Sequence, residues 1–180
     1  MRTTKIALLV VNLLGGIAVL GSYFLGFATH PRSSSALWGN VPPFLVVPYT
    51  VSMLAAATGY LAFTSFLLVG VRQETEADSR RFPYRGLPWI YLAVLAPSAA
   101  WMPLTFVMLD HPTALLWAAI RVVLGIVGLA SIALLLWILG TRPEGRRWFR
   151  ELALAGSILF ILQTAVLDAI VWPAFFPVRF

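Results

Sequence analysis

The sequence lacks cysteine, and only 11% of its 180 residues are charged. Without cysteine the chain has no disulfides, no thiolate metal ligands, no covalently attached haem and no cysteine nucleophile. Soluble domains average about 25% charged residues, whereas 60% of this chain is hydrophobic. Because a water-soluble fold cannot bury so much apolar surface, the composition predicts an integral membrane protein.

Five continuous apolar runs are each long enough to cross about 30 Å of hydrocarbon as a helix. They cover residues 6–28, 44–71, 87–109, 114–139 and 152–176. A β-barrel would show alternating segments of about ten residues instead. The first run exceeds the roughly 7 to 15 apolar residues of a signal peptide. We therefore expect an all-α membrane protein, with residues 1–180 forming a single five-helix transmembrane domain.

The basic residues are divided unevenly between the two sides that five crossings define. Of the 13 lysines and arginines, ten fall on the side of the N-terminus and the second and fourth loops: Arg2, Lys5, Arg72, Arg80, Arg81, Arg85, Arg142, Arg146, Arg147 and Arg150. The other side has Arg32 and Arg179. Positive charge marks the cytoplasmic side, so we expect a cytoplasmic N-terminus, an outer C-terminus and a bacterial inner membrane. This placement explains the net charge without a nucleic-acid partner.

Small residues and prolines within the runs predict where the helices approach and where they separate. Ala55 and Gly59 have the spacing that allows two helix backbones to approach closely, within the bundle or between subunits. Pro48, Pro97 and Pro103 each remove a backbone hydrogen bond and favour kinks that open space. The third and fourth helices are joined by about three residues and should be antiparallel neighbours.

Two ionisable residues, Arg121 and Asp168, lie well inside the predicted hydrocarbon. Each costs about 2.5 to 3.5 kcal/mol at the centre of a membrane helix on insertion scales. Both are roughly 10 to 12 Å from the outer end of their helix at 1.5 Å per residue. We hypothesise that they pair and line a cavity between the fourth and fifth helices. The alternative is an ion pair that only fixes helix register.

Thr164, Asp168 and Trp172 recur at intervals of four residues and should share one face of the fifth helix. This face could bind a ligand that has polar and flat apolar parts, or it could serve ordinary packing with Trp172 at the membrane interface. Trp38 precedes a double proline in the first loop, and Trp101 precedes Pro103 in the third helix. These two tryptophans are candidates for the same cavity.

The two histidines, His30 and His111, are both expected on the outer side. A metal or haem site there is conceivable, but two histidines without cysteine or further carboxylates form a weak ligand set, so we favour surface or interfacial roles and no metal. No serine–histidine–acid triad, paired catalytic carboxylates, phosphate-binding loop or HExxH motif is visible. The sequence therefore indicates no catalytic residue and favours a protein that is not an enzyme.

Three segments resemble the translocator protein family, also called tryptophan-rich sensory proteins or TspO. The fifth run contains VLDAIVW at 166–172, similar to the family's V-L-N-x-x-V-W with Asp168 in place of asparagine. The third run contains WMPLTF at 101–106, similar to W-x-P-x-F-F. The second run begins with a double proline after Trp38 and later contains Gly59 and Tyr60. All three occur in the family's order on the corresponding helices.

The resemblance implies a five-helix bundle with an internal pocket that is capped by the first loop. Family members bind flat amphipathic molecules such as porphyrin, haem or sterol, and are usually homodimers. By position, Trp38 would belong to the lid, Trp101 and Phe106 to the wall from the third helix, and Asp168 and Trp172 to the wall from the fifth. Arg121 and Thr164 join this set of candidate ligand-binding residues on the residue arguments above.

Three functions follow as hypotheses. The first is a sensor or carrier that binds an amphipathic ligand within the membrane without a required cofactor, a bound porphyrin or haem being the ligand itself. The second is a membrane enzyme that acts on a tetrapyrrole. The third is a small accessory subunit whose tryptophan and alanine faces contact other helices of a larger assembly.

Overall fold

The computed structural model describes residues 2–31, 35–71, 83–141 and 147–176. All regular elements in these ranges are helical. Five helices are long and apolar enough to cross a membrane, namely Thr3–Thr29, Pro43–Gly70, Tyr84–Asp110, Ala114–Gly140 and Arg147–Phe175. The predicted all-α architecture with five helices long and apolar enough to span a membrane is therefore confirmed.

The first span is α1 (Arg2–Thr29), and the second is α2 (Pro43–Ser65) with its π-helical continuation η2 (Phe66–Gly70). The third comprises the 3₁₀ turn η3 (Tyr84–Gly86) and α4 (Leu87–Asp110), and the fourth is α5 (Ala114–Gly140). The fifth runs through α6 (Arg147–Ile161), the π-helix η4 (Leu162–Val171) and α7 (Trp172–Phe175). A 3₁₀ turn, η1 (Ala36–Trp38), lies in the first loop.

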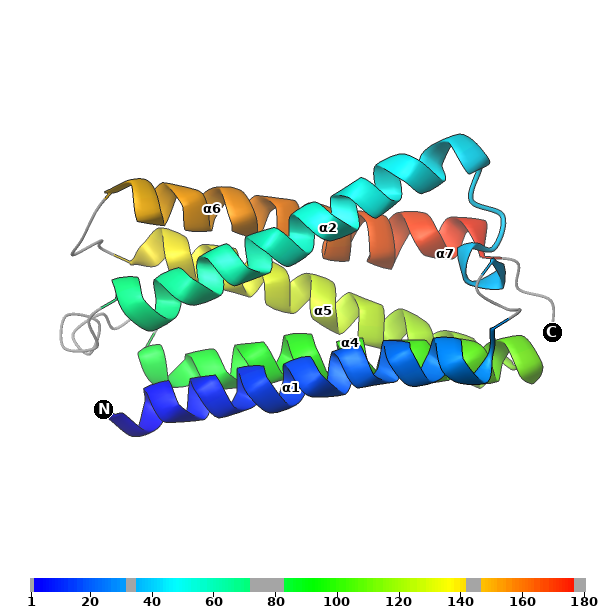
Figure 1. Ribbon diagram of the computed structural model, residues 1–180, viewed down its shortest axis with the longest axis horizontal. Coiled ribbons are helices and arrows are strands. Elements are labelled where there is room, and N and C mark those ends of the chain that lie inside the picture. Colours follow the sequence, from blue (N-terminus) through cyan, green and yellow to red (C-terminus); the bar gives the residue numbers. More distant parts are fainter. Residues whose placement is uncertain (1, 32–34, 72–82, 142–146, 177–180) are drawn as a thin grey trace.

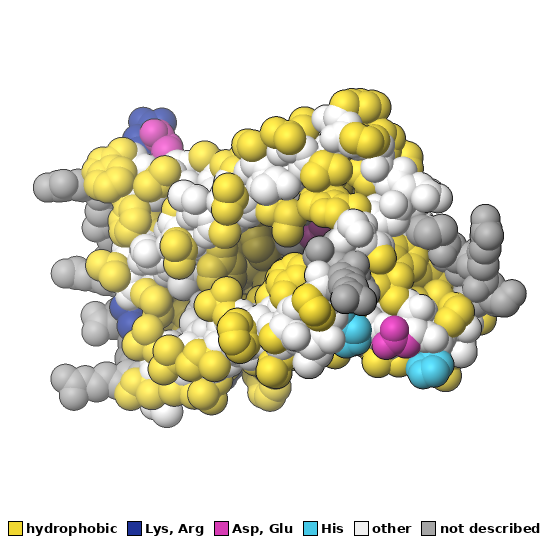
Figure 2. Space-filling view, turned by 45° about the vertical axis from the view of Figure 1, so that its right-hand side comes forward, with side chains coloured by type: hydrophobic (Ala, Val, Ile, Leu, Met, Phe, Trp, Pro, Cys, Tyr) yellow, Lys and Arg dark blue, Asp and Glu magenta, His cyan; other side chains and the backbone are white. Residues whose placement is uncertain are grey.

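Most of the arginines behind the predicted topology lie outside the described residues: Arg32, Arg72, Arg80, Arg81, Arg142, Arg146 and Arg179. The apolar surface of the described part is consistent with lipid surroundings. Figure 2 shows hydrophobic side chains over most of one face, and Leu20 and Phe24 are each 74% exposed. Side chains this apolar gain by contact with lipid chains rather than water.

The helices pack in the spatial order α1, α4, α5, fifth span, α2 (Figure 1). α4 and α5 are neighbours, as their short connection predicted. α1 packs along α4, whereas α2 packs along α6. α1 and α2 are consequently the two edge helices, and α4, α5 and the fifth span lie between them in this order.

The closest helix crossing joins α2 to α6 at two glycines. A Cβ atom added to Gly156 would lie 2.7 Å from the carbonyl oxygen of Gly59, and a Cβ on Gly59 would meet the backbone of Gly156. Backbones can approach this closely only where neither residue has a side chain. The small-residue spacing around Gly59 therefore serves packing within the bundle.

The end of the bundle that carries the N-terminus, here called the closed end, is filled with large side chains. Phe63, Tyr91 and Trp137 are almost fully buried in its core. The hydroxyl of Tyr60 donates to Asn12 Oδ1 at 2.6 Å and links the edge helices α1 and α2. The opposite end, which carries η1 and is called the loop-one end, has no comparable link between α1 and α2 among the described residues.

We expect the Gly59→Ala variant to unfold at a lower temperature than the wild type, because its methyl group would push α2 away from α6. The cost should be about 1 to 3 kcal/mol, as is typical of overpacked sites. Gly125→Ala is the matched control, since no heavy atom lies within 4 Å of its added Cβ. Thermal melts in one detergent test this expectation, and equal melting temperatures for both variants would contradict the role of the crossing.

Candidate ligand-binding cavity

A cavity of about 450 Å³ lies at the loop-one end of the bundle. This volume is within the range of about 300 to 1,000 Å³ that small-molecule pockets occupy. All five spans and the first loop contribute to its lining, which consists of Tyr23, Phe27, Ser35, Leu37, Trp38, Tyr49, Met53, Ser98, Trp101, Met102, Leu124, Val127, Thr164, Asp168 and Trp172. Figure 2 shows the surface hollowed between the α1 and α2 edges.

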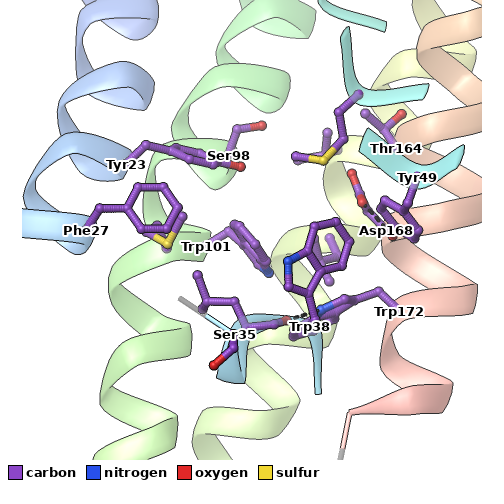
Figure 3. Close-up of a pocket in the computed structure, with 15 residues that line it drawn as sticks. Tyr23, Phe27, Ser35, Trp38, Tyr49, Ser98, Trp101, Thr164, Asp168 and Trp172 are labelled. Atoms are coloured by element: carbon purple, nitrogen blue, oxygen red, sulfur yellow. Dashed lines mark hydrogen bonds between the residues drawn. The ribbon is translucent and has the colours of Figure 1, made fainter. Parts of the chain in front are cut away.

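The cavity walls are dominated by aromatic rings from five different elements (Figure 3). Trp38 of η1 meets Tyr49 of α2 edge to face, with ring centroids 5.5 Å apart. Trp101 of α4 meets Trp172 of α7 in the same manner at 5.7 Å. Tyr23 of α1 lies 5.9 Å from Trp101. These rings provide flat apolar surfaces against which a ligand can stack.

Asp168 lies in the π-helix η4, and its carboxyl group points towards the cavity (Figure 3). Its Oδ1 accepts hydrogen bonds from the Tyr49 hydroxyl at 2.9 Å and from Gln163 Nε2 at 2.8 Å. In a π-helix, residues five apart stack one turn above another, whereas in an α-helix they point in different directions. The π-helical geometry is therefore what places Gln163 beside Asp168.

The polar groups of lining residues that have no hydrogen bond within the described part of the chain include Asp168 Oδ2 and the Trp101 indole N–H. Asp168 Oδ2 accepts no hydrogen bond there, because both donors bind Oδ1. The indole N–H of Trp101 is buried and unpaired. An unsatisfied buried donor costs about 1 to 3 kcal/mol, so a ligand that accepts a hydrogen bond from the Trp101 N–H gains affinity.

The first loop is fastened over the cavity by hydrogen bonds to the fifth span. Trp172 Nε1 donates to the carbonyl oxygen of Leu37 at 2.8 Å, and the backbone N–H of Asn40 donates to the carbonyl oxygen of Phe175 at 2.8 Å. Leu37 itself is buried. The loop thus forms one wall of the cavity and depends on Trp172 for its position.

Five of the predicted site residues line this cavity together: Trp38, Trp101, Thr164, Asp168 and Trp172. The stripe predicted on the fifth helix does face inward, although η4 is a π-helix rather than an α-helix. Thr164 is itself engaged, since its hydroxyl bonds Ser131 Oγ at 3.0 Å and the Phe160 carbonyl oxygen at 2.8 Å. Its role in the wall is therefore partly structural.

Phe106 was predicted to share a wall with Trp101, but it lies outside this cavity. Its ring is buried and stacks on the His30 imidazole, with centroids 4.2 Å apart. Trp101 and Phe106 are five positions apart on α4, so their side chains point in directions about 140° apart at 3.6 residues per turn. Trp101 can face the cavity only if Phe106 faces α1.

The predicted ion pair between Arg121 and Asp168 is not present. Arg121 is exposed on α5, outside the cavity, and its guanidinium carbon lies 5.9 Å from the Trp117 ring centroid. The neighbouring Ile120 and Leu124 face the core instead. The sequence shows that Arg121 and Asp168 lie at similar depths in the membrane. It does not show the direction in which each side chain points from its helix, because that direction depends on packing.

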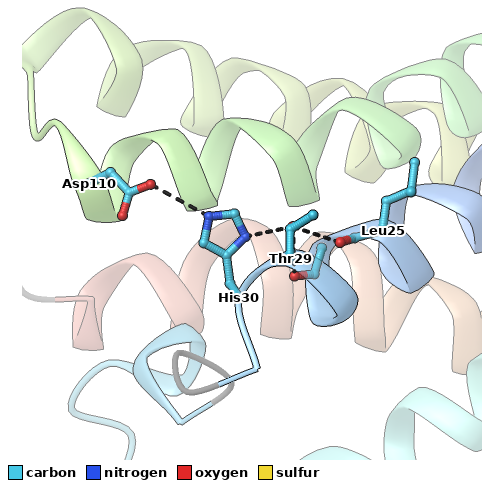
Figure 4. A network of polar contacts seen from close by, with 5 residues as sticks. Leu25, Thr29, His30 and Asp110 are labelled. Atoms are coloured by element: carbon cyan, nitrogen blue, oxygen red, sulfur yellow. Dashed lines mark hydrogen bonds and ion pairs between the residues drawn. The ribbon is translucent and has the colours of Figure 1, made fainter.

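The His30 side chain joins the ends of α1 and α4 in a small polar network (Figure 4). Its Nε2 lies 3.5 Å from Asp110 Oδ2, and its Nδ1 lies 2.8 Å from the Thr29 hydroxyl oxygen. That hydroxyl also donates to the Leu25 carbonyl oxygen at 2.7 Å. His111 is exposed. Within the described ranges, no three histidine, cysteine, aspartate or glutamate side chains cluster as metal ligands.

No protein-family model, curated protein or solved structure matches this chain. The resemblance to the translocator protein family therefore stays a prediction that rests on three short motifs. The cavity itself is described by its own geometry and does not depend on that resemblance.

Sequence reasoning missed Tyr23, Tyr49 and Gln163 as parts of the site or its support. Each has a polar group within an otherwise apolar run, and such groups need a hydrogen-bond partner in a membrane. That signal was present in the sequence. It did not identify the partners, because Tyr49 and Asp168 are separated by 119 residues.

We expect the Trp172→Phe variant to loosen the first loop, because phenylalanine retains a ring but cannot donate to Leu37. Loss of one hydrogen bond of about 1 kcal/mol should raise amide exchange at residues 36–41 roughly five- to tenfold. Hydrogen exchange measured by mass spectrometry tests this expectation. Trp148→Phe, at a 54% exposed position, is the control, and equal exchange in both variants would argue against the anchoring role of Trp172.

We expect Arg121→Gln and Asp168→Asn to change the free energy of unfolding independently. The double variant should equal the sum of the two single variants within about 0.5 kcal/mol, as for residues without direct contact. Denaturant titration in mixed micelles provides the three values. A coupling energy above about 1 kcal/mol would instead favour the ion pair that the sequence predicted.

Proposed function

We propose that this protein is a non-catalytic membrane binding protein, a sensor or carrier that takes a flat amphipathic small molecule into the cavity at the loop-one end. The observation that carries the proposal is the cavity of about 450 Å³, with aromatic walls and a single carboxyl group. Apolar pockets with a few convergent polar groups are the usual form of ligand sites.

The walls supply two kinds of interaction for such a ligand. Stacking on Trp38, Trp101 or Trp172 adds about 0.5 to 1.5 kcal/mol per aromatic pair beyond the burial of apolar area. Asp168 Oδ2 and the Trp101 N–H offer an acceptor and a donor for the polar part of the ligand. These polar groups would give the ligand a defined orientation, which an entirely apolar cavity would not.

The hollow between the α1 and α2 edges supports entry from the lipid phase (Figure 2). With the N-terminus in the cytoplasm, as positive charge predicts, the cavity would lie in the outer half of a bacterial inner membrane. The resemblance to the translocator protein family adds porphyrin, haem and sterol as candidate ligands and a homodimer as the assembly.

A ligand titration of the purified protein tests the proposal. Lipid nanodiscs containing the protein are titrated with protoporphyrin IX and with the neutral three-ring aromatic 9-methylanthracene, and bound ligand is measured against empty discs. We expect saturable binding of at least one ligand, weakened about tenfold in Trp101→Ala by the loss of stacking and buried area.

The control for this titration is Trp89→Ala, because Trp89 is 73% exposed and is not part of the cavity lining. Its affinity should equal that of the wild type. If Trp101→Ala also binds like the wild type, the ligand occupies another place. If neither ligand binds above the level of empty discs, the binding function itself is contradicted.

A further inference from the structure

Asp168 carries the only formal charge among the described residues that line the cavity. The other polar lining groups are neutral hydroxyls and indole N–H groups from serine, threonine, tyrosine and tryptophan. The ion pairs found in the described part of the chain, His30 with Asp110 and Arg147 with Glu151, do not involve it. The carboxyl group is thus without a cationic partner in the described protein.

The two hydrogen bonds to Asp168 come from neutral donors and orient the carboxyl group without balancing its charge. Tyr49 and Gln163 both bind Oδ1, which fixes the plane of the group and leaves Oδ2 available on the cavity side. A carboxylate within a membrane span is costly unless it is paired. A ligand with a positive charge would offset this cost.

The aromatic walls favour the same sign of charge. The faces of tryptophan and tyrosine rings are negative, and each attracts a nearby cation by about 0.5 to 2 kcal/mol depending on desolvation. Trp38, Trp101, Trp172 and Tyr49 all line the cavity that holds Asp168 (Figure 3). A carboxylate combined with several aromatic rings is the chemistry that recognises organic ammonium and related cations.

We propose that the cavity selects organic cations, which are molecules with a flat apolar body and a positively charged nitrogen that lies against Asp168. This inference rests on the proposed binding function and specifies the class of ligand. It also has a negative consequence, because a ligand with free carboxylates would bring like charge to Asp168. Neutral or cationic ligands are therefore preferred over anionic ones, which places sterol ahead of porphyrin and haem, with their free carboxylates, among the candidates of the proposed function.

Three ligands of one shape but different charge test this proposal. They are the permanent cation 10-methylacridinium, the neutral 9-methylanthracene and the anion 9-anthracenecarboxylate. Binding to the wild type, Asp168→Asn and Asp110→Asn is measured by equilibrium dialysis, in nanodiscs of a zwitterionic lipid with empty discs as the blank. Asp110→Asn is the matched control, since Asp110 has the same side chain but lies outside the cavity lining.

We expect the wild type to bind the cation at least about tenfold more tightly than the neutral ligand, and the anion most weakly. Asp168→Asn retains the shape and the Oδ1 acceptor, so it should lose at least about tenfold in affinity for the cation but less than about twofold for the neutral ligand. Asp110→Asn should behave as the wild type for all three ligands.

Each other outcome has a distinct meaning. Equal wild-type affinity for the cation and the neutral ligand would overturn the charge preference but leave the binding function intact. A cation preference that persists in Asp168→Asn would overturn the assignment to this carboxyl group. Binding of none of the three ligands would contradict the binding function itself. The wild-type comparison decides the charge preference even if Asp168→Asn fails to fold.

Discussion

Lipid chains are as apolar as the side chains that face them, so burial of apolar surface does little to hold membrane helices together. Close backbone contact must do so instead, and in this protein it occurs where Gly59 of α2 meets Gly156 of α6. Towards the loop-one end, Tyr49 of α2 and Trp172 of α7 line the cavity instead. The closed end is therefore filled by large core side chains, whereas the loop-one end contains the cavity.

The π-helix η4 helps to accommodate the Asp168 carboxyl group within a membrane span. Its wider turn brings Gln163 beside Asp168, while Tyr49 reaches the same oxygen from α2. The Tyr49 hydrogen bond ties the fifth span to α2 at the level of the cavity. One carboxyl oxygen serves this structural link, and the other accepts no hydrogen bond within the described protein. In the proposed function, structure and binding would therefore use different atoms of one residue.

The first loop connects the cavity to the C-terminal end of the fifth span. Trp172 meets Trp101 edge to face in the wall and simultaneously holds Leu37 through its indole N–H. A ligand that displaces Trp172 would therefore alter the position of the loop as well as the shape of the cavity. This coupling suits a sensor, in which occupancy must change a surface that other molecules can detect, and also a carrier, in which the loop controls release.

The sequence by itself determined the fold class, the five long apolar helices and the shared helix face of Thr164, Asp168 and Trp172, because apolar length and helical spacing are local properties. Only the tertiary structure decided that Arg121 faces outward, that Phe106 packs on His30, and that Tyr49 bonds Asp168. Depth in the membrane can be counted along the chain. The direction in which a side chain points depends on how each helix rotates to pack. In the fifth span it also depends on the π-helix η4, which no residue pattern predicted.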